Sequence, residues 1–319
     1  MTQLLERVKL GRTDLDVTRI CFGTSPLADM PQVYGYGVDE DQSTKTLKAM
    51  FESPVNFMDT SRGYGRGRSE RDIGNVLNAI GGLPKGYVLA TKLDREYDND
   101  NKFDASSMRK SLEESLEALG LDYIQLMHIH DVEYASVPDD VTRTGGAIDE
   151  LFKMKEEGIV GAVGLAAGAV DVMMPMLRDW DFDAMLTHNR FTLINRSADP
   201  MIDLCVSRGT AVLNAAPYGS GILAKGASNF ARYAYRDAPE SVLGPVRKIE
   251  EICARHNVPM GAAALQFSMR DPRVTSTVIG ITKIERIEQT IAWANWDIPQ
   301  AAWDELLALP FATNDPQKV

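Results

Sequence analysis

Four side chains that can hold or transfer a proton follow short apolar segments in the first half of the chain. They are Asp59, Tyr64, Lys92 and His130. A lysine ammonium beside a tyrosine lowers the pKa of the phenol, which is about 10 when unperturbed, and a carboxylate keeps the ammonium protonated. A nearby histidine can hydrogen-bond a substrate oxygen. The set contains no nucleophile–base pair of the hydrolytic kind, so it indicates proton exchange with an alcohol or carbonyl oxygen, coupled to hydride transfer with a separate cofactor.

The apolar segments before these residues are typical of buried parallel strands, because each is a short apolar run closed by a polar residue. Amphipathic stretches of helical length separate them, and the alternation continues through the chain. Eight strands are predicted at residues 19–23, 55–58, 87–91, 123–129, 160–165, 184–187, 211–213 and 274–279. In a barrel of strand–helix units the carboxyl ends of all strands open onto one face, so the four side chains would converge there.

The remaining segments complete a single α/β domain. Helices are predicted at residues 41–51, from an N-cap at Ser69 onward, at 106–119, 147–157, 170–177 and 200–208, up to about His256, and at 259–270, 286–293 and 300–309, with a long loop at 219–239. A hairpin at residues 7–17 would cover the bottom of the barrel. Because no linker interrupts the alternation, residues 1–319 are predicted to form one (β/α)8 TIM barrel with this N-terminal β-hairpin and an extra C-terminal helix.

The composition favours a cytoplasmic protein with a small substrate. Apolar residues make up 44% of the 319 residues and charged residues 25%, as in globular proteins with an ample core. The net charge of −11 disfavours nucleic acid as a partner. Residues 1–7 lack the apolar region of a signal peptide, and no apolar run is long enough to span a membrane. The cysteines, at 21, 205 and 253, are isolated, as is typical of a reducing compartment.

Several motifs, in their order along the chain, resemble the aldo-keto reductase superfamily. They are Met-Asp-Thr-Ser at 58–61, Tyr-Gly at 64–65, Ser-Glu at 69–70, Thr-Lys at 91–92, Asp-Tyr-Ile at 122–124 and Ile-His at 129–130. Segments at 129–131, 220–224, 238–239 and 258–267 resemble a narrower branch. That branch holds bacterial D-threo-aldose 1-dehydrogenases (L-fucose or L-galactose dehydrogenases) and pyridoxal 4-dehydrogenase. With the hairpin and the eight units, the resemblance covers almost the whole chain.

The resemblance implies a catalytic tetrad of Asp59, Tyr64, Lys92 and His130. It also implies oxidation of an aldose of the L-fucose, L-galactose or D-arabinose type at C1 to the lactone. Tyr64 would remove the proton of the anomeric hydroxyl while hydride moves from C1 to the nicotinamide, and in reverse it would protonate a carbonyl. An NADPH-dependent general aldehyde or ketone reductase and a pyridoxal dehydrogenase stay open as alternatives.

The resemblance also places a dinucleotide across the barrel mouth. The residues implied to bind it are Asp59, Asn189, Tyr218, Gly219, Ser220, Gly221, Leu223, Gly280, Lys283 and Arg286. Backbone N–H groups of the loop at 219–223 suit a pyrophosphate. The usual nicotinamide contacts are replaced by alanines at 166–167 and 215. Asn189, Arg190 or Tyr218 would then have to compensate.

The choice between NAD and NADP depends on the segment after the last predicted strand. Many relatives hold the 2′-phosphate of NADP there with a Lys-Ser pair, where this chain has Gly280 and Ile281. Loss of the lysine removes a strong phosphate partner, although Lys283 and Arg286 follow nearby. NAD is therefore favoured over NADP.

Two alternatives come from other classes of protein. His128 and His130 form an H-x-H pair that is also found in metal-dependent barrel hydrolases. Those hydrolases carry the pair on the first strand, and here it lies on the fourth, so we expect no metal and expect His128 to fill the barrel. The replaced nicotinamide contacts also leave open a non-catalytic subunit that senses the dinucleotide. The favoured partner remains a small sugar or aldehyde.

Overall fold

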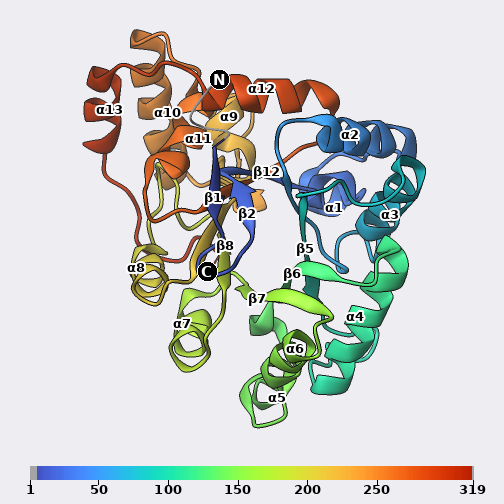
Figure 1. Ribbon diagram of the computed structural model, residues 1–319. Helices are drawn as coiled ribbons and strands as arrows, with labels where there is room; N and C mark the ends of the chain where they lie inside the picture. The colour runs from blue at the N-terminus through green and yellow to red at the C-terminus, as the bar shows by residue number, and fades with distance from the viewer. Residues whose placement is uncertain (1–5, 318–319) are drawn as a thin grey trace.

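The computed structural model describes residues 6–317 and contains a closed barrel of eight parallel strands (Figure 1). Around the barrel the strands follow the order β12-β3-β4-β5-β6-β7-β8-β9. Their bounds are β3 Ile20–Gly23, β4 Phe57–Asp59, β5 Val88–Leu93, β6 Ile124–His130, β7 Val160–Ala166, β8 Ala184–His188, β9 Ala211–Ala215 and β12 Ser276–Gly280. The predicted barrel is confirmed. The predicted domain range also included residues 1–5 and 318–319, which lie outside the described residues.

The reactive residues lie in the last positions of their strands. Asp59 and His130 are the final residues of β4 and β6, and Lys92 is the next-to-last residue of β5. Most predicted strands end one or two residues too early, and the residues left out include the polar Asp59, Lys92 and His130. Lys92 pairs with His128 in the β5–β6 register. The parallel arrangement therefore brings these side chains to one rim of the barrel.

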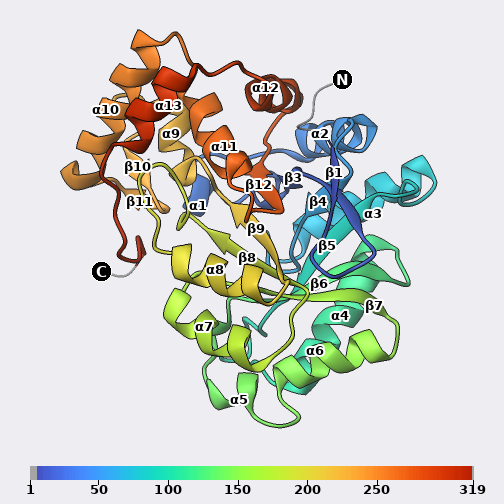
Figure 2. The same ribbon diagram turned by 60° about the vertical axis from the view of Figure 1, so that its left-hand side comes forward.

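Helices surround the barrel, as Figure 2 shows. Their bounds are α1 Pro31–Tyr34, α2 Glu40–Glu52, α3 Arg68–Ile80, α4 Ala105–Leu119, α5 Asp139–Thr142, α6 Ala147–Glu156, α7 Val170–Asp179, α8 Asp199–Ser207, α9 Ile222–Lys225, α10 Glu240–Arg255, α11 Met260–Arg270, α12 Ile284–Ala294 and α13 Gln300–Leu307. The helix α4 illustrates how they form. Asp104 caps its first turn by accepting from the Ser107 N–H, Met108 and Leu112 bury one face, and Gly120 ends it at φ 65°. No helix in the described part is long and apolar enough to span a membrane.

The start of α3 differs from the prediction. Ser69 is not the N-cap, because the helix begins at Arg68 after Gly67, which is left-handed at φ 86°. Ser69 is buried in the first turn instead, and its hydroxyl lies 2.8 Å from that of Thr24 and 2.9 Å from that of Thr60. These hydrogen bonds attach α3 to the loops that follow β3 and β4.

A hairpin closes the amino-terminal end of the barrel, as predicted. It consists of β1 (Arg7–Lys9) paired with β2 (Asp16–Thr18). Leu10 and Val17 are fully buried and belong to the same apolar cluster as the interior side chains Phe57, Leu126 and Leu213. A second, larger cluster lies between the strands and the surrounding helices. Apolar side chains thus fill the amino-terminal half of the barrel interior. A cavity lies at the opposite, carboxyl-terminal end.

Two segments near the barrel mouth are more ordered than predicted. The expected loop at 219–239 contains α9 and a two-stranded sheet of β10 (Arg232–Tyr233) and β11 (Arg236–Asp237). After α13 the chain continues away from that helix, as Figure 2 shows. Ala312 accepts a backbone hydrogen bond from the Arg196 N–H and donates one to the Ile194 carbonyl, in the segment after β8. The last described residue, Gln317, lies 3.0 Å from His188 Nε2 at the end of β8.

Candidate active site

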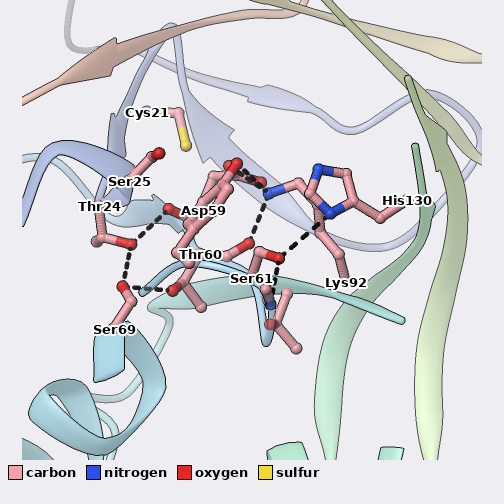
Figure 3. Close-up of polar contacts among 12 residues, drawn as sticks. Cys21, Thr24, Ser25, Asp59, Thr60, Ser61, Ser69, Lys92 and His130 are labelled. Atoms are coloured by element: carbon pink, nitrogen blue, oxygen red, sulfur yellow. Dashed lines mark hydrogen bonds and ion pairs between the residues drawn. The ribbon is translucent and has the colours of Figure 1, made fainter. Parts of the chain in front are cut away.

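Lys92 is the centre of the polar group at the mouth of the barrel. Its side chain is buried, and Nζ donates to Asp59 Oδ1 at 2.8 Å, to the Thr60 carbonyl at 2.6 Å and to the Tyr64 hydroxyl at 3.1 Å (Figure 3). An ammonium has three protons to donate, so every one is used. Since Tyr64 accepts from Lys92, its own proton is free to point into the cavity.

The protonation of Tyr64 differs from the expectation. Burial raises the pKa of Tyr64 well above 10, and the negative charge of Asp59 acts in the same direction. The expectation of a lowered pKa beside Lys92 is therefore wrong. Tyr64 is a neutral phenol at ordinary pH, which makes it a proton donor to a carbonyl oxygen.

His130 lies beside Tyr64, with their rings edge to face and 5.8 Å apart. Its Nδ1 is 2.7 Å from Asp94 Oδ1. The same nitrogen lies 3.3 Å from the Ser61 hydroxyl, a contact drawn in Figure 3. Its Nε2 is 3.6 Å from Asp131 Oδ1. Burial alone would lower the pKa of His130, but the carboxylates of Asp131 and Asp94 outweigh it and raise the pKa. The four predicted catalytic side chains thus meet at one place.

A cavity of about 880 Å³ opens above these residues. Its lining includes Asp59, Tyr64, Lys92, His130, Tyr218, Ser220, Gly221, Gly280 and Arg286 among the predicted site residues. The cavity is large enough for a dinucleotide fragment and a small second molecule, as expected of a cofactor site.

Four predicted cofactor residues do not reach the cavity wall. Gly219 and Leu223 are buried behind Ser220 and Gly221, and Asn189 is buried where it accepts a hydrogen bond from the Ser220 hydroxyl at 3.4 Å. The Lys283 side chain is exposed at the start of α12 and does not line the cavity. Its predicted role as substitute phosphate partner is not supported by this placement.

Lys225, rather than Lys283, lies at the cavity. It lines the cavity together with Arg286 and Gly280, and among the described residues neither cation forms an ion pair with a carboxylate. Burial and the positive charge of Arg286 both lower the pKa of Lys225. Two unpaired cations that repel each other suit the phosphates of a dinucleotide. The sequence signal that could have found this residue is a lysine just after the glycine loop.

A second charged group at the cavity involves the C-terminal tail. Arg190, after β8, is buried and forms a two-pronged ion pair with Asp315, with N–O distances of 2.8 to 3.1 Å. Gln317 accepts from Arg190 at 2.7 Å and lies 3.0 Å from His188 Nε2. Both tail residues line the cavity. The tail has no periodic pattern in its sequence, so its approach to the site was missed.

His128 fills the barrel interior, as expected. It is fully buried, burial lowers its pKa well below 6.5, and its neighbour across β7 is Gly164. His130, two residues on, is already bonded to Asp94. Within the described range 6–317, no three His, Cys, Asp or Glu side chains form a group that could hold a metal ion.

The barrel and the side chains at its mouth define an oxidoreductase that works with NAD(P). Over residues 19–309 the chain matches the Aldo/keto reductase family, and it therefore belongs to that family. A holo-form aldo-keto reductase from Bacillus halodurans has the same fold, with a TM-score of 0.79 and 20% identity over 98% of this chain and 99% of that one.

The curated relatives confirm the branch that the sequence motifs indicated. The chain is 27% identical to pyridoxal 4-dehydrogenase of Microbacterium luteolum, over 94% of this chain and 96% of that protein. It is 29% identical to L-galactose dehydrogenase of Arabidopsis thaliana, over 90% and 88% respectively. It is 28% identical to D-threo-aldose 1-dehydrogenase of a Pseudomonas species, over 84% and 88%.

Proposed function

We propose that this enzyme oxidises an aldose of the L-fucose, L-galactose or D-arabinose type at C1 to the lactone, with Tyr64 as the acid–base group. The observation that carries the proposal is the contact of Lys92 Nζ with both Asp59 and Tyr64, at the mouth of a cavity that also contains His130. The Asp59 carboxylate keeps Lys92 protonated, and the Lys92 ammonium donates a hydrogen bond to the Tyr64 oxygen.

The proton and the hydride leave the sugar together in this scheme. The anomeric hydroxyl gives its proton to Tyr64 Oη, and NAD(P) when bound supplies the acceptor for the C1 hydride. Lys92 stabilises the negative charge of Tyr64 that this direction requires. Because burial raises the pKa of Tyr64, oxidation is expected to accelerate with rising pH and reduction to slow.

The cavity wall supports a small polyhydroxylated substrate. Tyr34, Tyr134 and Tyr235 provide aromatic surface near the four catalytic side chains, and Asp131 and Glu133 provide carboxylates that accept from hydroxyl groups. Relatives that carry sugar names, the L-galactose and D-threo-aldose dehydrogenases, support the same substrate class.

The proposed coenzyme is NAD. Gly280 lies at the cavity where many relatives are expected to carry a phosphate-binding lysine, and Lys283 does not replace it. Arg286 and Lys225 remain as partners of the pyrophosphate. We therefore expect the absence of one cation to weaken NADP binding. The KM for NADP should be about tenfold above that for NAD.

A second candidate is the reduction of an aldehyde or ketone with NADPH. The neutral phenol of Tyr64 favours this direction, because a protonated tyrosine can donate to a carbonyl oxygen at once. The two neighbouring cations Arg286 and Lys225 would then bind the 2′-phosphate of the coenzyme.

The test measures formation or loss of reduced nicotinamide with NAD and NADP. The substrates are L-fucose, L-galactose, D-arabinose, pyridoxal and a simple aldehyde. Tyr64→Phe is expected to lose at least about 10³-fold in kcat while its Kd for the dinucleotide stays within about twofold. Turnover of a sugar by the variant at the wild-type rate would rule out Tyr64 as the acid–base group, and reduction of the aldehyde alone would favour the second candidate.

A further inference from the structure

A fifth buried ionisable group, Asp94, lies directly behind the catalytic side chains. It follows β5, and both of its carboxylate oxygens have two partners. Oδ1 is 2.7 Å from His130 Nδ1 and accepts from the Tyr97 hydroxyl at 2.9 Å. Oδ2 accepts from the Ser61 hydroxyl at 2.5 Å and from the Gly63 N–H at 2.6 Å. Such a carboxylate is fixed in place and has no vacancy for another proton.

The donors around Asp94 keep it ionised. Burial alone would raise its pKa, but His130, Ser61 and the Gly63 N–H together lower the pKa well below its usual range. An ionised carboxylate can only accept, so the proton shared with His130 must be carried by Nδ1. The tautomer of His130 is thereby determined by Asp94.

The backbone is shaped to allow this contact. A Cβ at Gly63 would lie 2.8 Å from Asp94 Oδ1 and would also clash with the Tyr97 hydroxyl. Only a glycine lets the loop after β4 approach closely enough for its N–H to reach the carboxylate. Asp94 itself is fixed from the other side, where its N–H donates to the Ser111 hydroxyl of α4 at 3.0 Å.

We propose that Asp94 is a positioning residue, which holds the Nδ1 proton of His130 so that Nε2 is reserved for the substrate oxygen. In the charged ring Nε2–H donates to a carbonyl oxygen, and in the neutral ring Nε2 accepts from a hydroxyl. The same histidine can then serve both directions of the reaction without changing its tautomer. The proposal rests on the proposed function of the site only for the identity of that oxygen.

The charge of His130 depends on all the groups that surround it. They are Asp59 and Tyr64 from β4 and its loop, Lys92 and Asp94 from β5 and its loop, His128 and Asp131 from β6 and its loop, and His188 from β8. Tyr97 and Arg190 lie one contact further out, on Asp94 and on His188 respectively. Asp131 and Asp94 supply the negative charges that outweigh burial. Removing one of the two should lower the pKa of the ring while leaving the barrel intact.

The decisive variant is Asp94→Asn, which keeps the size of the side chain and removes its charge. An amide N–H facing Nδ1 would reverse the tautomer, so kcat/KM is expected to fall roughly 100-fold, in line with the loss of groups that orient a histidine. The limb of the pH profile that reports His130 is expected to move to lower pH by about one unit or more. The matched control is Tyr97→Phe, which removes one hydrogen bond to Asp94 but no charge, and which should leave that limb in place.

Two further measurements separate this proposal from the proposed function. Ring-nitrogen NMR of the wild-type protein, which has four histidines, should show His130 protonated at Nδ1 in its neutral form and titrating above 6.5. This readout needs neither turnover nor a variant that folds. In kinetics, Asp94→Asn should cost no more than about twofold once His130→Ala is present. A neutral His130 protonated at Nε2, or a full additional loss in the double variant, would overturn the proposal.

Discussion

At the scale of single residues, the site depends on buried charges whose partners are all supplied by the protein. Lys92 is fully buried, and its charge is tolerated because Asp59, Thr60 and Tyr64 each accept a hydrogen bond from its ammonium. Glu70, in the first turn of α3, is also fully buried, and it accepts from the Thr91 hydroxyl at 2.5 Å. Unlike Lys92 it has no ion pair among the described residues.

Glu70 should make the stability of the protein depend on pH. Burial raises its pKa to about 7 in the folded state, against 4.5 for the ordinary side chain. The folded protein therefore binds more protons than the unfolded chain between these values, so stability falls as pH rises from about 4.5 to about 7. The shift corresponds to roughly 3 kcal/mol.

The measurement is urea unfolding of wild type and Glu70→Gln at several pH values. The variant cannot ionise, so it should lose this pH dependence and become the more stable of the two above pH 7 by up to about 3 kcal/mol. Parallel stability curves for the two proteins would show that Glu70 does not titrate in this window.

The sequence singled out four side chains that the structure brings together at the barrel mouth, and it missed the side chains behind them. Asp59, Tyr64, Lys92 and His130 each close or follow an apolar strand, a local pattern that can be recognised without a structure. Asp94 follows β5 and contacts His130 at the end of the neighbouring strand β6. Asp315 contacts Arg190 although 125 residues separate them in the sequence. Such contacts cannot be predicted from local residue spacing, because they depend on which strands become neighbours when the barrel forms.

At the scale of elements, the strand pair β6–β7 shows how the interior is fitted. Gly164 on β7 lies opposite His128 on β6 in the parallel register. A Cβ at Gly164 would clash with His128 Nδ1 and would lie 2.9 Å from the Ala184 carbonyl of β8. Because Gly164 has no side chain, the His128 ring can occupy the space beside it.

Gly164→Ala should destabilise the barrel by about 1–3 kcal/mol, because the clash includes backbone that cannot move aside. The matched control is Gly244→Ala in α10, where the nearest atom to the new Cβ is 3.9 Å away. That change should stabilise the protein by up to about 1 kcal/mol through helix propensity. Thermal or urea unfolding of both variants gives the comparison, and equal effects of the same sign would contradict the fitted interior.

Strand and helix order could be predicted, but several boundaries could not. The apolar runs determined which segments are strands, and the hairpin and the closing helix α13 were also recognisable. The capping role predicted for Ser69 was wrong, because tertiary hydrogen bonds to Thr24 and Thr60 hold its hydroxyl. The short elements β10, β11 and α9 carry too few residues to show a period.

At the scale of the whole molecule, the first and last described segments lie at opposite ends of the barrel. The hairpin β1–β2 fills the amino-terminal end, and the tail after α13 reaches the carboxyl-terminal mouth, where Asp315 and Gln317 line the cavity. The site is thus incomplete until the last described residues are in place.

Removal of residues 311–319 should therefore impair substrate binding more than coenzyme binding. Arg190 would lose its carboxylate partner, while Arg286 and Lys225 would keep their contacts. We expect KM for the sugar or aldehyde to rise about tenfold and the dinucleotide Kd to stay within about twofold. Asp315→Ala tests the same contact without deletion. An unchanged KM in both variants would show that the tail does not take part in recognition.

The central claim is that Tyr64 and its partners remove a hydroxyl proton while hydride leaves C1 of an aldose. Its most direct test is incubation of the enzyme and NAD with L-fucose, L-galactose and D-arabinose, each deuterated at C1, followed by mass spectrometry of the coenzyme. We predict that deuterium appears on the reduced nicotinamide with wild type and that Tyr64→Phe transfers none. Reduced coenzyme without deuterium, or no reduction with any of the three sugars, would contradict this claim.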